Sequence, residues 1–245
     1  CPDGQEAVLL RAALPAAEEL TPPAVLPTSV HQAEQEFYDQ FKAVTEQDWD
    51  ELKAKLQEEI PATEPGIQPL KSSGTGPFTL QKEVFGWHPY WEGSGYTNYS
   101  FDLLSTIAYF SYEANPTTGY ATTMNSWSNT PLVQWAHSNG VDVVLCVTLF
   151  SGHSTFFGSA AAQSNMINEL VRLIQLRGAD GVNIDFEGIP GGYQAPLTAF
   201  MSNLTVRMHA SVPGSQVSIC LPAVDWSGNY DVAAFEGFLD LCIMM

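Results

Sequence analysis

The stretch Asp180-Gly-Val-Asn-Ile-Asp-Phe-Glu187 decides how this chain folds. Side chains alternate between the two faces of a strand, so Asn183, Asp185 and Glu187 share one face. Three polar groups on an otherwise apolar strand are costly to bury unless they have partners or a chemical task. We therefore predict a barrel strand whose polar face lines the lumen, with Glu187 at the C-terminal mouth. Asp185 is expected about 6 to 7 Å below it, the rise of two strand residues.

Apolar runs alternate with helical stretches around this strand, which is typical of repeated strand–helix units. Strands are predicted at 84–88, 106–111, 141–149, 181–187, 216–221 and 239–245. Apolar residues at helical spacing predict helices at 166–174, closed by Gly178, and at 197–208. The pattern predicts an α/β fold, a TIM (β/α)8 barrel truncated after about the sixth strand, and we expect the native barrel to continue past Met245. An open doubly wound sheet is the competing architecture, but no Gly-rich phosphate loop follows the first strand.

Composition divides the chain into four parts. Residues 1–30 are rich in Ala, Pro and Glu and predict a flexible lead. Residues 31–60 carry apolar residues at helical spacing and predict a helical hairpin, which is the N-terminal helical extension of the barrel. Residues 61–82 contain the Pro, Gly and Ser of a linker, and the barrel is expected over 83–245.

The charge balance restricts the partners of this chain. Its 27 acidic and 9 basic residues give a formal net charge of -18, which would repel the phosphates of nucleic acid. We therefore expect no nucleic-acid partner, whereas a neutral polysaccharide is not repelled. No run of about 18 apolar residues is present to form a spanning helix. Three cysteines lie in predicted strands and are expected to be buried thiols rather than disulfides or metal ligands, namely Cys146, Cys220 and Cys242.

The first residue, Cys1, leaves two interpretations open. A cysteine exposed by removal of a signal peptide can carry a lipid, and this would attach a secreted or cell-envelope lipoprotein to a membrane. A fragment boundary explains the same residue equally well. We expect an extracytoplasmic monomer.

The opening stretch resembles the signature of glycoside hydrolase family 18, Asp-Gly-x-Asp-x-Asp-x-Glu. Asp180, Gly181, Asp185 and Glu187 match it, while Asn183 replaces an aspartate, as in the spore-cortex and envelope branch of the family. Weaker resemblances cover the first two strands, at Phe85-Gly-Trp-His-Pro-Tyr-Trp91 and Leu104-Ser-Thr-Ile-Ala-Tyr-Phe110. The third strand is divergent, with Thr148-Leu-Phe-Ser-Gly152 in place of Ser-x-Gly-Gly, and Met245 resembles the start of the family's Met-x-Tyr-Asp.

The resemblance implies a chitinase-like enzyme that hydrolyses β-1,4-linked N-acetylglucosamine polymers with retention, without metal or cofactor. Chitin, chito-oligosaccharides and peptidoglycan all fit as substrates. In this mechanism Glu187 protonates the glycosidic oxygen while the substrate's own acetamido group attacks the anomeric carbon. Asp185 orients the acetamido N–H and helps to keep Glu187 protonated by repulsion between like charges. Asn183 is expected to tether Asp185 by a hydrogen bond.

Four further residues are expected to contact the substrate, namely Asp180, Trp87, Tyr109 and Trp226. For the three aromatic rings, packing in the core is the alternative. A catalytically silent, lectin-like barrel is the alternative function, and an inhibitor of other hydrolases is a third. Lectin-like members of the family commonly lose the terminal glutamate or its aspartate partner. Because this chain retains both, the sequence favours the enzyme.

Overall fold

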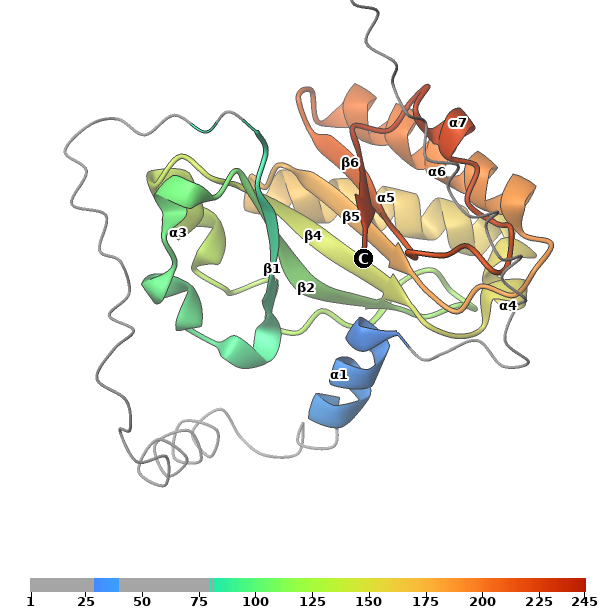
Figure 1. The fold of residues 1–245 in the computed structure, drawn as a ribbon, viewed down its shortest axis with the longest axis horizontal. Coiled ribbons are helices and arrows are strands. Elements are labelled where there is room, and N and C mark those ends of the chain that lie inside the picture. The colour runs from blue at the N-terminus through green and yellow to red at the C-terminus, as the bar shows by residue number, and fades with distance from the viewer. Residues whose placement is uncertain (1–28, 40–79, 81) are drawn as a thin grey trace, which may run out of the picture.

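The computed structural model describes residues 29–39, 80 and 82–245, which form an open half-barrel with one short helix at its mouth (Figure 1). Six parallel strands lie in the order β1-β2-β4-β5-β6-β7, and the short strand β3 pairs antiparallel with β2. The predicted α/β half-barrel is confirmed, whereas β3 was not predicted. The strands are β1 (Phe85–Pro89), β2 (Thr106–Ala114), β3 (Ala121–Thr123), β4 (Asp142–Leu149), β5 (Gly181–Phe186), β6 (Gln216–Leu221) and β7 (Leu241–Met244).

Helices cover the outer face of the sheet (Figure 1). The two longest agree with the predicted apolar stripes, and residues such as Met166, Leu170 and Phe200 are fully buried. Helix α5 ends at Gly178, whose φ of 62° is the left-handed conformation that glycine adopts without strain. The helices are α3 (Leu132–Ser138), α4 (His153–Phe157), α5 (Ala160–Arg177), α6 (Gln194–Ser211) and α7 (Val232–Phe235), with 3-10 turns at Tyr90–Glu92, Gly95–Asn98 and Phe101–Leu103.

The two faces of β5 meet different surroundings. Val182, Ile184 and Phe186 belong to the main apolar core between the sheet and its outer helices. Asn183 and Asp185 alternate with them and are fully buried on the opposite, inner face. A smaller apolar cluster on that inner side contains Ala108, Phe110, Val144 and Cys146. The sheet therefore holds a polar row against the lumen while its other face is fixed by apolar packing.

Helix α1 (Val30–Asp39) coincides with the first part of the predicted helical hairpin. The rest of that hairpin, most of the lead and the linker lie outside the described residues. Cys146 and Cys220 are buried thiols and Cys242 is a half-buried one, as expected. None of the helices in the described part of the chain is long and apolar enough to cross a membrane.

Gly181 allows β5 to pass close to β6. Its φ is 145°, and a Cβ at this position would lie 1.9 Å from the carbonyl oxygen of Gln216. We expect Gly181→Ala to lower the free energy of unfolding by about 3 kcal/mol, since backbone strain and overpacking add. Gly140→Ala is the control, because Gly140 also has a positive φ but open space around its Cβ position. Urea unfolding followed by circular dichroism measures both, and equal losses would contradict the close approach.

Candidate active site

The polar row lies at the C-terminal end of β5, at the mouth of the half-barrel. Glu187 directly follows the strand, and its backbone N–H donates to the carbonyl oxygen of Leu149 at the end of β4 (3.3 Å). Its side chain is 8% exposed, whereas Asp185 and Asn183 are fully buried below it. Two carboxyl groups of one strand face are thus removed from water at the place where barrel enzymes bind their substrates.

Asn183 joins three strands through its side-chain amide. Its Oδ1 accepts from the indole N–H of Trp87 on β1 (3.2 Å) and from the thiol of Cys220 on β6 (3.4 Å). Its Nδ2 donates to the hydroxyl of Ser218 (3.0 Å). The expected hydrogen bond to Asp185 is not formed among the described residues, since the amide nitrogen donates to Ser218 instead. A neutral amide here avoids a third negative charge beside Asp185 and Glu187.

The charge of Asp185 influences the ionisation of Glu187. Burial and the charge of Asp185 raise the pKa of Glu187 to about 8, although a charge on His31 acts in the opposite direction. The raised pKa favours the protonated form of Glu187, which is the form that a general acid needs. Asp185 Oδ2 lies 2.7 Å from His31 Nδ1. Its other oxygen, Oδ1, is buried and has no hydrogen-bond partner among the described residues.

Helix α1 brings side chains to the site that the sequence analysis did not assign to it. The hydroxyl of Ser29 donates to Glu187 Oε2, and it accepts from the backbone N–H of Gln32 as the cap of α1 (3.0 Å). His31 contacts Asp185, 154 residues away in the sequence. The only local signal was a serine before a helical pattern, which predicts a helix start but not its position in space.

His31, Asp185 and Glu187 have the composition of a metal site, since their ligand atoms lie within 4.8 Å of one another. However, the 2.7 Å between His31 Nδ1 and Asp185 Oδ2 is the length of a direct hydrogen bond. Two ligands of a tetrahedral zinc ion lie about 3.3 Å apart, given metal–ligand bonds of about 2.0 Å. The spacing therefore fits a shared proton better than a shared ion.

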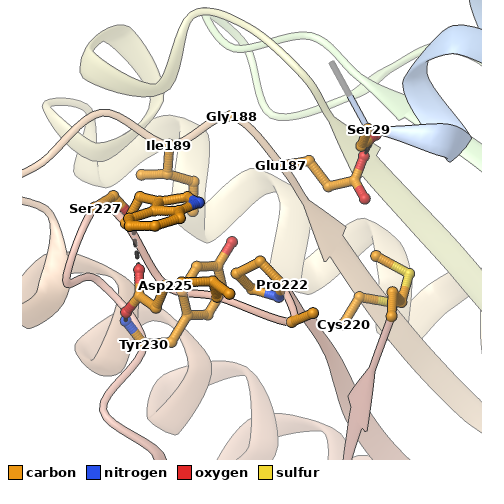
Figure 2. A pocket seen from close by; sticks show the side chains of 13 residues that line it. Ser29, Glu187, Gly188, Ile189, Cys220, Pro222, Asp225, Ser227 and Tyr230 are labelled. Atoms are coloured by element: carbon orange, nitrogen blue, oxygen red, sulfur yellow. Dashed lines mark hydrogen bonds between the residues drawn. The ribbon is translucent and has the colours of Figure 1, made fainter. Parts of the chain in front are cut away.

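A cavity of about 310 Å³ opens beside Glu187 (Figure 2). Figure 2 shows the Glu187 side chain extending from the end of β5 toward Ser29, with Cys220 and Pro222 below it. The cavity runs between the segments that follow β5 and β6, and half-buried Trp226 lines it. Other lining residues are Gly188, Ile189, Ala223, Val224, Asp225, Ser227, Tyr230 and Met245.

The side chains of Asn229 and Asp225 hold the wall of this cavity. Asn229 is fully buried, and its amide donates to the carbonyl oxygens of Ile189 (3.1 Å) and Pro190 (2.8 Å). It therefore ties the segment after β6 to the segment after β5. Asp225 accepts from the backbone N–H groups of Gly228 and Tyr230, each at 2.9 Å. Burial raises the pKa of Asp225, but these hydrogen bonds outweigh burial and leave the pKa below its usual value.

The structure brings five of the seven expected site residues to this region and places two elsewhere. Trp87 contacts Asn183 in the lumen, and Trp226 lines the cavity. Tyr109 instead points to the outer side of β2, where it is 3% exposed and packs on Trp127. Asp180 precedes β5, at the opposite end from Glu187. There it accepts from the backbone N–H of Val143 (2.7 Å) and pairs with His137 (2.7 Å), which fixes neighbouring strands.

Comparisons with known proteins agree with this architecture. No family model matches the chain. Over 153 residues, 58% of this chain, it is 25% identical to the protein named sporulation-specific glycosylase YdhD of Bacillus subtilis, of which the match covers 35%. Solved structures that resemble it include the spore cortex-lytic enzyme SleL of Bacillus megaterium (TM-score 0.58, 15% identity, 66% of this chain and 41% of that one).

Two further solved structures resemble the chain and have different names. One is a GH18 chitinase from Cycas revoluta in complex with (GlcNAc)4 (TM-score 0.56, 16% identity, covering 66% of this chain and 54% of that one). The other is a chitinase-like agglutinin from Robinia pseudoacacia (TM-score 0.57, 13% identity, covering 66% and 54%). The chain spans about half or less of each of these proteins. The resemblance to the chitinase-like branch of family 18 is confirmed in the fold.

The dependence of Glu187 on its neighbour can be tested by Asp185→Asn. Removal of the Asp185 charge should lower the pKa of Glu187 below about 8, but burial, the larger cause, should keep it above its ordinary value of 4.5. Carbon-13 NMR of glutamate carboxyl groups across a pH titration measures this. Asp180→Asn, at the far end of β5, should leave the pKa of Glu187 unchanged. An unchanged or higher pKa in Asp185→Asn would contradict the interaction.

Proposed function

We propose that this chain carries the catalytic half-barrel of a family 18 glycoside hydrolase that cleaves β-1,4-linked N-acetylglucosamine polymers with retention. One observation carries the proposal: a buried pair of carboxyl groups on one strand face, in which burial and the charge of Asp185 raise the pKa of Glu187. A strongly raised carboxyl pKa in a cleft is what a general acid needs. Asp185 and Asn183 complete the proposed catalytic row.

The first step breaks the glycosidic bond. Glu187 transfers its proton to the glycosidic oxygen, and the bond between that oxygen and the anomeric carbon breaks with its electron pair on the leaving sugar. The carbonyl oxygen of the substrate's 2-acetamido group attacks the same carbon, so that an oxazolinium intermediate forms without a protein nucleophile. We assign the acetamido N–H to Oδ1 of Asp185, which lacks a hydrogen-bond partner among the described residues. Its negative charge stabilises the positive charge that develops on the ring.

The second step restores the enzyme. Glu187, now a carboxylate, takes a proton from water, and the oxygen of that water bonds to the anomeric carbon as the acetamido oxygen leaves. Two displacements at one carbon retain its configuration. The same group thus serves as acid and then as base, and the substrate replaces the second protein carboxylate of most glycosidases.

The substrate class rests on chemistry and on the names of similar proteins. A neutral acetamido sugar needs a hydrogen-bond acceptor and flat apolar surfaces, and we assign these roles to the unpartnered oxygen of Asp185 and to Trp226, which lines the cavity. The similar proteins are named chitinases and spore cortex-lytic enzymes, so chitin-type and peptidoglycan-type polymers are both proposed. Both polymers lie outside the cytoplasm, which agrees with an extracytoplasmic protein.

Glycan binding without catalysis is the second candidate. It is favoured by the likeness to a chitinase-like agglutinin and by the contacts of α1 with both carboxyl groups. The retained pair of Glu187 and Asp185 argues for the enzyme, because binding alone does not require a buried proton donor.

Glu187→Gln separates the two candidates. The amide keeps the shape of the side chain but cannot transfer a proton, so we expect hydrolysis to fall by at least about 10²-fold with nearly unchanged binding. Turnover of chitotetraose and of purified peptidoglycan measures the first effect, and calorimetry measures the second. Glu169→Gln, on the outer helix α5, is the matched control. Unchanged turnover would contradict Glu187 as the acid, whereas tight binding without turnover in the parent protein would favour the lectin-like candidate.

A further inference from the structure

Helix α1 lies at the mouth of the half-barrel (Figure 1), and the N-terminal end of the helix contacts the two carboxyl groups. Ser29 at its start contacts Glu187, and His31 in its first turn contacts Asp185. The His31 ring also lies edge-on against the rings of Trp87 and Phe110, with centroids 5.3 Å and 5.5 Å away. The first turn of α1 thus occupies the space immediately above the proposed catalytic row.

The rest of α1 is fixed to the ends of other strands. Gln35 is 8% exposed, and its Oε1 accepts from the hydroxyl groups of Ser111 on β2 and Thr148 on β4, each at 3.4 Å. At the last turn, the hydroxyl of Tyr90 after β1 donates to Asp39 (3.1 Å). Contacts with β1, β2, β4 and β5 place α1 across the mouth instead of along its rim.

The groups that α1 presents have the same chemistry as the proposed substrate. The hydroxyl of Ser29, which contacts Glu187, corresponds to a sugar oxygen that meets the general acid. The ring nitrogen of His31, which contacts Asp185, corresponds to an acetamido N–H. A sugar bound at the proposed catalytic row would need the Glu187 carboxyl group that Ser29 engages and the space beside Asp185 that the His31 ring occupies. Helix and glycan therefore cannot occupy this site together.

We propose that α1 is an internal competitor of the glycan, which covers Asp185 and Glu187 and must leave before substrate binds. This inference rests on the proposed function and adds regulation of access to the same site. When a segment of the chain occupies a binding site, the apparent affinity falls in proportion to the fraction of molecules whose site is open. Loss of the Ser29 and His31 contacts should raise that fraction.

The charges around His31 give α1 a dependence on pH. Burial lowers the pKa of His31, but the hydrogen bond to Asp185 and the charges of Asp185, Glu187 and Glu34 outweigh burial and leave it above 6.5. Trp87 and Phe110, which also face the ring, are uncharged. A raised histidine pKa means that the contact is strongest below pH 6.5 and weakens as the pH rises through the raised value. Alkaline conditions therefore favour the open site.

The test compares the affinity of the whole chain for chitotetraose before and after Ser29→Ala combined with His31→Ala. Calorimetry near pH 6, at a temperature at which no cleavage product forms, should show binding about 10-fold tighter or more in the double variant, since two contacts that hold the site closed are lost. His137→Ala is the matched control. His137 also pairs with an aspartate at 2.7 Å, but at the far end of β5, and its loss should leave the affinity unchanged.

Three outcomes separate this inference from the function on which it rests. Tighter binding only in the double variant supports both. Equal binding in the parent protein and the double variant overturns the competitor but leaves the proposed function standing. If neither the parent protein nor any variant binds chitotetraose or peptidoglycan, the proposed function is overturned, and the proposed competition between α1 and the glycan is overturned as well. Proton NMR adds a readout without glycan: the pKa of His31 should fall in Asp185→Asn, and an unchanged value would overturn the contact.

Discussion

The burial of two carboxyl groups side by side, Asp185 and Glu187, is the constraint on which the rest of this structure depends. Two negative charges so close and so far from water are unfavourable, and this raises the pKa of Glu187 and favours its protonated form. The residues next to Asp185 and Glu187 add no further negative charge. Asn183 below is neutral and shares its amide with Trp87 and Ser218, while His31 above brings the nearest group that can carry a positive charge.

The fold keeps this pair in place by fixing the opposite face of the same strand. Ile184 and Phe186 alternate with the polar row and are buried under α5 and α6, so β5 cannot rotate to expose its carboxyl groups. At the other end of β5, Asp180 accepts a hydrogen bond from the backbone of β4. Asn229 then ties together the two segments that form the cavity beside Glu187. Preorganisation of this kind lets a buried acid act without first moving.

Sequence reasoning succeeded where a short pattern is sufficient. Six apolar runs gave the six parallel strands, and strict alternation put Asn183 and Asp185 on one face. The same alternation could have excluded Tyr109, because it lies one residue from Phe110, which faces the lumen. Asp180 lies at the start of the strand, seven residues before Glu187, and so could not share its mouth. The position of α1 had no local signal, since its contacts with the two carboxyl groups join residues more than 150 positions apart.

The stereochemistry of the first product tests the central claim most directly. Proton NMR during the early turnover of chitotetraose distinguishes the anomer that is released from the one that mutarotation forms later. The account predicts the β-anomer first, because the acetamido group of the substrate and then water attack the same carbon from opposite faces. Release of the α-anomer first, or a sugar covalently bound to Asp185 or Glu187, would contradict it.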